Sequence, residues 1–438
     1  MNNKDPLHIG LIGLGTVGTG VARLLREQAD RLARRAGRPL NLKLVAVRQP
    51  HKPRALDFPP GTITTDPWQI IDHPEVDVVV ELMGGIHPAR ELVLGALERG
   101  KDVVTANKAL LCEHGEQLFQ RARDLGRTIA FEAAVAGGIP IIAAVGQAMA
   151  ANQILSMKAI LNGTCNYILT EMTFKNQSYA QALTQAQALG YAEADPSLDV
   201  KGIDAAQKLC ILAQLAFGRK VHVTDFPVTG ITHLEASDIT YARQLGYVIK
   251  LLACARLHKT KLELNVQPTL IKQNQPLAQI HGSYNAVMLE GDVVGTVWYS
   301  GRGAGQFPTA SAVVADLIDL AIGRAQLTFP HLDLGNTPAP IELLPSEHTT
   351  SRFYLRLMVE DRPHVMADVT HVLGAAGISL ASVIQPEVPE SEGETDIPIV
   401  PLIIMTHRTS MGRMHAAEIE LKNLDCVRQP MITLPAAD

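Results

Sequence analysis

The chain has 438 residues, of which 47% are hydrophobic and 19% are charged, and its formal net charge is -5. This length predicts two or three domains, and the composition is typical of a globular protein. A small negative charge without a long basic run argues against nucleic acid as a partner, and the apolar runs are too short to span a membrane. The five scattered cysteines and the lack of a signal layout at the N-terminus indicate a cytoplasmic protein.

A glycine turn lies near the N-terminus, between an apolar run at 7–12 and a helical pattern. The turn reads Gly13-Leu14-Gly15-Thr16-Val17-Gly18. Gly13 permits a tight turn, Gly15 lets the backbone approach a pyrophosphate, and Gly18 lets helix and strand pack closely. The helix N-terminus, with Thr16 and Val17, offers N–H groups to the anion. The alternative is a glycine-rich turn without a ligand.

Strand and helix patterns alternate through the rest of the first 135 residues. Helical patterns at 87–100 and 109–126 separate further apolar runs that read as strands, which cover 41–47, 76–85, 101–107 and 127–135. This alternation predicts an α/β fold with a parallel, doubly wound sheet of the Rossmann type. Ligands are then expected at the carboxyl ends of the strands.

Basic residues follow two of these strands. An NAD site usually has an acid after the second strand, which holds the ribose 2′-OH, but Arg48 and Lys52 stand there. A guanidinium favours a 2′-phosphate, so NADP is expected ahead of NAD, although a solvated basic loop is the alternative. The fourth strand leads into Lys108, which would point toward the nicotinamide or be an ordinary surface lysine.

The region after residue 150 changes in character. The run at 154–172 reads as a strand and then a helix that starts near Gly163 and Thr164. Backbone N–H groups at such a start suit a substrate carboxylate.

An acidic loop with Glu193 and Asp199 then precedes a helix in which Asp204 and Lys208 are four residues apart and share a face. One interpretation is a solvated loop beside a surface ion pair. The other starts from an amino-acid alcohol, whose ammonium requires carboxylates and whose hydroxyl requires a proton acceptor. A lysine can take that role when burial or neighbouring charge alters its pKa.

The sequence strongly resembles the homoserine dehydrogenase family, of the monofunctional kind. The segment 186–208 fits the family signature throughout, and further matches are GLIGLGTVG, TANKALL, FEAAVAGGIPII, LNGTCNYIL and GRGAGQFPTA. The resemblance implies NAD(P)-dependent interconversion of L-homoserine and L-aspartate 4-semialdehyde, on the route to threonine, isoleucine and methionine. It also implies a mixed α+β substrate and dimerisation domain.

The resemblance implies roles for individual residues. Lys208 is similar to the family's proton donor and acceptor, and Lys108 to its partner beside the nicotinamide. Glu193 and Asp204 match substrate contacts, with Asp199 in a supporting position.

A second set of implied roles concerns a cation and the nicotinamide. The family binds a monovalent cation, typically sodium, through backbone carbonyls. The matching positions are Glu132, Val135, Gly137 and Ile139, while Gly303 matches a segment that returns to the nicotinamide.

The C-terminal part predicts a further module. Residues 331–349 read as a linker, and 350–438 read as β-α-β-β-α-β, a ferredoxin-like order that resembles an ACT domain. His364 stands where that family usually has glycine, so feedback by a threonine effector is an open question, and a module serving mainly in assembly is the alternative.

The expected organisation is therefore a nucleotide domain at 1–135, to which 305–330 return, and a substrate domain at 136–304, followed by the linker and the module. A homodimer or homotetramer is implied. Two alternative functions are a dehydrogenase of another amino-acid alcohol and a non-catalytic sensor of NADP and an amino acid.

Overall fold

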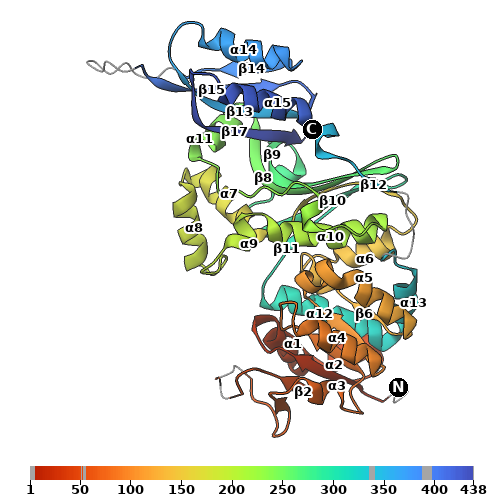
Figure 1. Ribbon diagram of the computed structural model, residues 1–438. Coiled ribbons are helices and arrows are strands. Elements are labelled where there is room, and N and C mark those ends of the chain that lie inside the picture. The colour runs from red at the N-terminus through yellow and green to blue at the C-terminus, as the bar shows by residue number, and fades with distance from the viewer. Residues whose placement is uncertain (1–4, 51, 53–55, 335–340, 387–396, 438) are drawn as a thin grey trace. The chain divides into compact units, whose positions relative to one another are not determined.

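The structure is a computed structural model, shown as a ribbon in Figure 1. The chain forms two compact units. Unit 1 contains Met1–Gly163, Asp204–Asp225 and Tyr284–Ile341, and unit 2 contains Thr164–Ile203, Phe226–Ser283 and Glu342–Asp438. The described residues are 5–50, 52, 56–334, 341–386 and 397–437. Residues 136–304, which we expected to form one substrate domain, contribute to both units. Part of the predicted linker, 335–340, lies outside the described residues.

A parallel six-stranded sheet forms the base of unit 1. Its strand order is β3-β2-β1-β4-β5-β6, which is the doubly wound Rossmann order. The strands are β1 (Leu7–Ile12), β2 (Leu40–Ala46), β3 (Ile63–Thr64), β4 (Val78–Glu81), β5 (Asp102–Thr105) and β6 (Ile129–Ala130). Sequence analysis had missed β3, because two residues are too few to show a periodic pattern.

Helices cover this sheet, and two of them, α12 and α13, come from late in the chain. The apolar residues of α12 recur at 310, 313, 314, 317 and 320, so one face of the helix enters the same core as β1 and β4. Gly20 of α1 packs closely against it, since a Cβ there would lie 2.8 Å from the Gln306 carbonyl oxygen. The helices are α1 (Thr16–Glu27), α2 (Ala29–Ala36), α3 (Trp68–Ile71), α4 (Ala89–Glu98), α5 (Lys108–Asp124), α12 (Gln306–Ile322) and α13 (Arg324–Thr328).

Unit 1 also holds three antiparallel strands in the order β11-β10-β7. These are β7 (Ile154–Ile160), β10 (Tyr284–Gly291) and β11 (Gly295–Arg302). Almost all of α10 (Ile203–Phe217) belongs to this unit, and the short helical turns are η1 (Glu132–Ala134), α6 (Ile141–Ala143), η2 (Ala144–Ala148), η3 (Val223–Asp225) and η5 (Phe329–His331).

Unit 2 is organised around a long hairpin of two 12-residue strands, β8 and β9. β8 was also missed from the sequence, because its buried apolar run lacks a clear alternation. The elements are α7 (Gly163–Lys175), α8 (Tyr179–Ala188), α9 (Ser197–Val200), α11 (Ala236–Gln244), β8 (Tyr247–His258), β9 (Lys261–Lys272), η4 (Pro276–Gln279), β12 (Glu342–Leu343) and η6 (Ser346–His348).

Apart from the two-residue β16, the C-terminal elements of unit 2 have the β-α-β-β-α-β order that the sequence predicts, in the blue region of Figure 1. The antiparallel order is β17-β13-β15-β14, and the last residues of β17 pair in parallel with β9. The elements are β13 (Thr350–Glu360), α14 (Val365–Ala375), β14 (Leu380–Ile384), β15 (Ile399–Thr406), β16 (Thr409–Ser410), α15 (Met411–Lys422) and β17 (Val427–Ala437).

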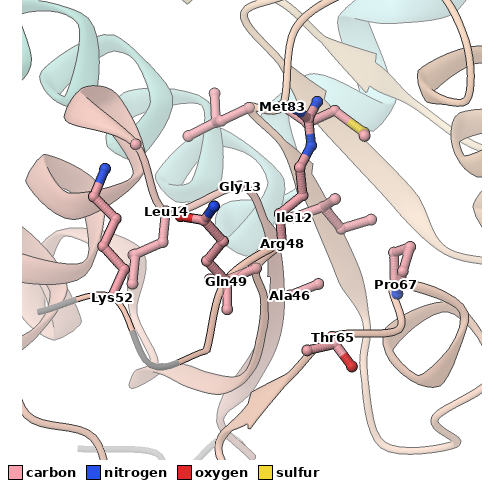
Figure 2. A pocket seen from close by; sticks show the side chains of 13 residues that line it. Ile12, Gly13, Leu14, Ala46, Arg48, Gln49, Lys52, Thr65, Pro67 and Met83 are labelled. Carbon is pink, nitrogen blue, oxygen red and sulfur yellow. The ribbon is translucent and has the colours of Figure 1, made fainter. Parts of the chain in front are cut away.

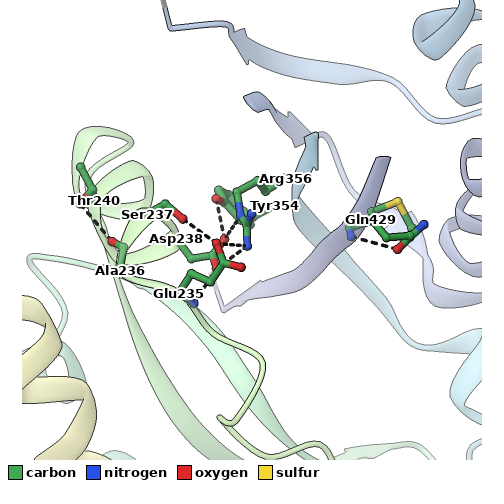
Figure 3. A network of polar contacts seen from close by, with 9 residues as sticks. Glu235, Ala236, Ser237, Asp238, Thr240, Tyr354, Arg356 and Gln429 are labelled. Atoms are coloured by element: carbon green, nitrogen blue, oxygen red, sulfur yellow. Dashed lines mark hydrogen bonds and ion pairs between the residues drawn. The ribbon is translucent and has the colours of Figure 1, made fainter. Parts of the chain in front are cut away.

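The two faces of β13 have different roles because side chains alternate along a strand. Phe353, Leu355 and Leu357 enter the apolar core under α14 and α15. On the other face, Arg356 reaches the helix α11: its Nε lies 2.7 Å from Asp238 Oδ1 and its Nη2 lies 3.1 Å from Oδ2 (Figure 3). This buried ion pair attaches the C-terminal elements to α11.

Candidate active site

The glycine turn has the geometry that a dinucleotide requires. Gly13 has φ +99, in the region that favours glycine, and a Cβ on Gly18 would lie 2.1 Å from the Gly13 carbonyl oxygen. By contrast, among the residues that the structure describes, none lies within 4 Å of a Cβ on Gly15, and none caps the N-terminus of α1 with its side chain. Open space therefore lies beside Gly15 at the N-terminus of α1, where the N–H groups of Thr16 and Val17 begin the helix, and the residues present fit a pyrophosphate.

A cavity of about 480 Å³ opens beside this turn, at the ends of β1 and β2 (Figure 2). Arg48 and Lys52 are its charged lining residues, and no carboxylate is among the described residues that line it. The lining consists of Ile12, Gly13, Leu14, Gly15, Ala46, Val47, Arg48, Gln49, Lys52, Thr65, Pro67, Leu82 and Met83. The charge of this cavity fits an anionic group.

The carboxyl ends of β4 and β5 carry a polar cluster that sequence analysis missed. Glu81, the last residue of β4, is completely buried. Its Oε2 accepts a 2.7 Å hydrogen bond from Thr105 Oγ1, and its Oε1 accepts a 2.9 Å bond from the Met83 N–H. A lone glutamate at the end of an apolar run gives no signal of this network, because its partners lie elsewhere in the sequence.

Lys108 and Lys208 meet at one buried carboxylate, that of Asp204. The Nζ of Lys108 lies 2.5 Å from Asp204 Oδ1, and the Nζ of Lys208 lies 2.8 Å from Oδ2. Asn162 Nδ2 donates to the same Oδ2 at 2.8 Å, and Lys208 also donates to the Leu161 carbonyl oxygen at 2.8 Å. Segments around residues 108, 162 and 208 therefore converge on a single acid.

Burial decides between the two interpretations of the Asp204 and Lys208 pair. Their side chains are only 5% and 10% exposed, so they do not form a surface ion pair. Burial alone would raise the pKa of Asp204, but the charges of Lys208 and Lys108 outweigh it and hold this pKa well below its usual value. The carboxylate is therefore ionised and holds two ammonium groups next to each other.

The other predicted substrate contacts belong to unit 2, apart from Gly163, which starts α7. The hydroxyl of Thr164 donates to the Tyr191 carbonyl oxygen at 2.6 Å and to Asp199 Oδ2 at 3.1 Å, so the structure brings these two predicted residues together. Glu193 is exposed, and its carbonyl oxygen accepts a hydrogen bond from Gln187.

The predicted cation segment is a buried turn in unit 1. Val135 is fully buried, Ile139 is 2% exposed, and Ala136 between them has φ +49. The side chain of Glu132 is engaged elsewhere, because its two oxygens accept the N–H groups of Ile142 and Ala143 at 2.8 Å. The described residues include no group of three or more His, Cys, Asp or Glu side chains arranged to hold a metal.

Two glycines near this turn are packed tightly. A Cβ on Gly303 would lie 2.1 Å from Asn285 Cγ, and one on Gly137 would lie 2.8 Å from Thr309 Oγ1. Both positions therefore exclude a side chain.

The doubly wound sheet and the glycine turn define the class of Rossmann-fold, dinucleotide-binding proteins. Two family models match the chain: homoserine dehydrogenase over residues 140–318, and homoserine dehydrogenase, NAD binding domain, over residues 13–132. The homoserine dehydrogenase of Pseudomonas aeruginosa is 45% identical over 435 residues, covering 98% of both chains.

Solved structures agree with these sequence matches. A crystal structure of a homoserine dehydrogenase from Thiobacillus denitrificans is 42% identical, with a TM-score of 0.89 over 99% of this chain and 98% of that one. A hyperthermophilic archaeal homoserine dehydrogenase in complex with NADPH is 25% identical, with a TM-score of 0.61 over 74% of this chain and 99% of that one. The chain belongs to the homoserine dehydrogenase family and is an NAD(P)-dependent oxidoreductase that interconverts L-homoserine and L-aspartate 4-semialdehyde.

Among the described residues, no helix combines the length and the apolar composition needed to cross a bilayer.

Proposed function

We propose that Lys208 transfers the proton of the homoserine hydroxyl and that Lys108 assists it at the same oxygen. The observation that carries this proposal is the convergence of both ammonium groups on Asp204, at 2.5 and 2.8 Å. When bound, the nicotinamide supplies or accepts the hydride at the substrate carbon. In the reductive direction Lys208 donates a proton to the forming hydroxyl, and in the oxidative direction it accepts one, so oxidation is expected to speed up with rising pH.

Asp204 has the complementary role of holding the two lysines close together although their charges repel. The charges of Lys208 and Lys108 lower the pKa of Asp204 against its burial, so the carboxylate accepts from both lysines while they are charged. The buried pair also fixes the rotamer of Lys208, and a fixed geometry reduces the entropy cost of reaching the transition state.

The test is steady-state homoserine oxidation by Lys208→Ala, with NADP binding measured separately. We expect kcat to fall about 100-fold or more, the range for losing a general acid–base group, with little change in the NADP dissociation constant. Lys220→Ala is the matched control. Lys220 lies just after α10, the helix that carries Lys208, and it is a partly exposed lysine that pairs with Glu116. Full turnover by Lys208→Ala would defeat the assignment and leave the fold untouched.

The ammonium and carboxylate groups of homoserine are proposed to bind at separate places. Glu193 and Asp199, with Asp204, provide negative charge for the substrate ammonium, and the N–H groups at Gly163 and Thr164 receive its carboxylate. A Glu193→Gln variant should therefore raise the KM for homoserine more than it lowers kcat. Serine and other hydroxy acids should be poor substrates; efficient turnover of another amino-acid alcohol would favour the alternative of a related dehydrogenase.

We propose NADP as the preferred cofactor, with Arg48 at the 2′-phosphate. Support comes from the basic cavity beside the glycine turn and from the NADPH complex of the archaeal relative. Arg48→Ala should weaken NADP binding more than NAD binding, because only NADP carries the phosphate. Equal losses for both cofactors would contradict this role of Arg48. Gly303 is proposed to approach the nicotinamide, where its lack of a side chain is needed.

A monovalent cation, with sodium as the first candidate, is proposed to bind the carbonyl oxygens of Glu132, Val135, Gly137 and Ile139. Support comes from the burial of this turn. The Ile139 carbonyl already accepts the Ile141 N–H at 2.8 Å, which leaves its second lone pair for a cation. Enzyme dialysed into a bulky organic cation should lose activity and recover it with sodium. Unchanged activity after that exchange would refute the cation site.

Residues 350–438 are proposed to act as an ACT-like regulatory module after the linker at 331–349, with 1–135, 305–330 and 136–304 as the catalytic domains. A homodimer or homotetramer in the cytoplasm is proposed. His364 adopts φ +74, a backbone conformation that glycine adopts more readily than histidine. His364→Gly should therefore strengthen inhibition by threonine. If threonine inhibits neither the wild-type enzyme nor His364→Gly, the module serves assembly instead.

A further inference from the structure

We propose that Glu81 is a positioning residue for Lys108, acting through the segment that leads into α5. Glu81 is completely buried at the carboxyl end of β4, and Lys108 is the first residue of α5, just after β5. Sequence analysis gave Glu81 no role. The inference rests on the catalytic role proposed above for Lys108.

The first link runs through Thr105, the last residue of β5. Its hydroxyl donates to Glu81 Oε2 at 2.7 Å and accepts the backbone N–H of Asn107 at 3.0 Å. Glu81 thereby orients the hydroxyl so that its oxygen faces the turn before Lys108. Both bonds are buried, so water does not compete for them.

The second link runs through Asn107. Its Nδ2 lies 3.5 Å from Glu81 Oε1 and donates to the Gly85 carbonyl oxygen at 2.7 Å, while its Oδ1 accepts the Leu110 N–H at 3.1 Å. Asn107 is therefore the N-cap of α5, and its side-chain NH2 group also contacts the Glu81 carboxylate. Because Lys108 is the next residue, the position of the Asn107 cap determines the position of the Lys108 Cα and therefore the reach of its side chain.

Glu81 also holds the loop that follows its own strand. Its Oε1 accepts the N–H groups of Met83 at 2.9 Å and Gly84 at 3.3 Å. No salt bridge to Glu81 is present among the residues that the structure describes, so neutral donors surround this carboxylate on both oxygens. Burial raises the pKa of Glu81, while the bonds from Thr105 and the Met83 N–H oppose that rise.

The arrangement predicts a particular pattern of kinetic effects. In Glu81→Gln one oxygen becomes an NH2 group, so either the Thr105 hydroxyl or the N–H groups of Met83 and Gly84 lose their acceptor. The turn before Lys108 should then lose its fixed position, and a displacement of about 1 Å at a catalytic group can lower kcat by about 100-fold. We expect a fall in kcat of at least about 10-fold, with a smaller change in the NADP dissociation constant.

The decisive experiment is a double-mutant cycle with Lys108→Met, measured as kcat of the full-length enzyme. If Glu81 acts through Lys108, adding Glu81→Gln to Lys108→Met should cause no further loss. Independent, multiplicative losses would overturn the inference, and so would wild-type kcat in Glu81→Gln. The role of Lys108 itself is judged separately, because Lys108→Met alone with normal turnover would overturn that proposal.

Two further variants separate positioning from general stability. Asp102→Asn is the matched control: Asp102 is a partly buried acid at the other end of β5 that accepts the Thr128 N–H at 2.9 Å. It should leave kcat unchanged. Should Glu81→Gln fail to fold, Thr105→Val removes the same hydroxyl link without touching the carboxylate, and Thr105→Ser restores it. The inference requires a low kcat in Thr105→Val and recovery in Thr105→Ser; equal kcat in the two refutes it.

Discussion

The ion pair between Arg356 and Asp238 leads to a quantitative prediction about stability. Their side chains are 2% and 0% exposed, and the guanidinium is held by two bonds of 2.7 and 3.1 Å. Burial disfavours the charged guanidinium, but the hydrogen bond and charge of Asp238 raise its pKa above the usual value. In Asp238→Asn this charge therefore stays buried and loses its main counter-charge.

The expected cost of Asp238→Asn follows from these contacts. Removing one partner of a buried pair costs about 3–5 kcal/mol. We expect the lower end, about 3 kcal/mol, because Glu235 remains 3.1 Å from Arg356 Nη2 although its side chain is 50% exposed. For a unit of about 200 residues, 1 kcal/mol corresponds to about 2–4 °C in Tm, so the transition of unit 2 should fall by about 6–12 °C.

The assay is thermal unfolding of the full-length protein as a double-mutant cycle with Arg356→Met. The double variant should cost clearly less than the sum of the two single variants, because it leaves no unpaired charge. Arg23→Ala, which breaks an exposed i,i+4 pair with Glu27, is the control and should cost under about 0.5 kcal/mol. Additive losses, or an Asp238→Asn protein that melts like wild type, would show that the pair does not hold the C-terminal elements on α11.

Three further predictions concern close packing and pH. Gly18→Ala should abolish tight cofactor binding, measured by fluorescence titration, since its Cβ would lie 2.1 Å from the Gly13 carbonyl oxygen. Gly230→Ala should lower the thermal stability of unit 2, since its Cβ would lie 1.9 Å from the Val200 carbonyl oxygen. The folded-state pKa of Asp204 lies below its unfolded value near 3.9, so its stabilisation is fully present above that pH and is lost as pH falls toward the folded pKa. In urea unfolding, the difference between wild type and Asp204→Asn should be constant above about pH 5 and shrink below about pH 4; a difference that does not shrink contradicts the lowered pKa.

Local patterns in the sequence were sufficient for most of the nucleotide-binding fold. The glycine spacing at 13–18 and the alternation of apolar runs with helical patterns predicted β1, β2, β4, β5 and β6, and all of them are present in a parallel sheet. These signals are local, because a turn needing φ above zero and a helix with one apolar face are both encoded within a few residues. The two-residue β3 is too short to show a period, and β8 escaped because its mostly apolar run lacks a clear alternation.

The burial of charged groups was not available from the sequence. Asp204 and Lys208 have the spacing of any surface i,i+4 pair, and their role depends on whether the helix face that carries them is covered. Glu81 and Arg356 gave no signal at all, since their partners lie 24 and 118 residues away along the chain.

The amino-acid sequence by itself determined the doubly wound sheet, the glycine turn for a dinucleotide and the family to which the chain belongs, because each depends on short-range spacing. Only the tertiary structure decided which charged side chains are buried and which acid they share. The free energy of a charge depends on the solvent and the partners around it, and folding brings those partners together from distant parts of the chain.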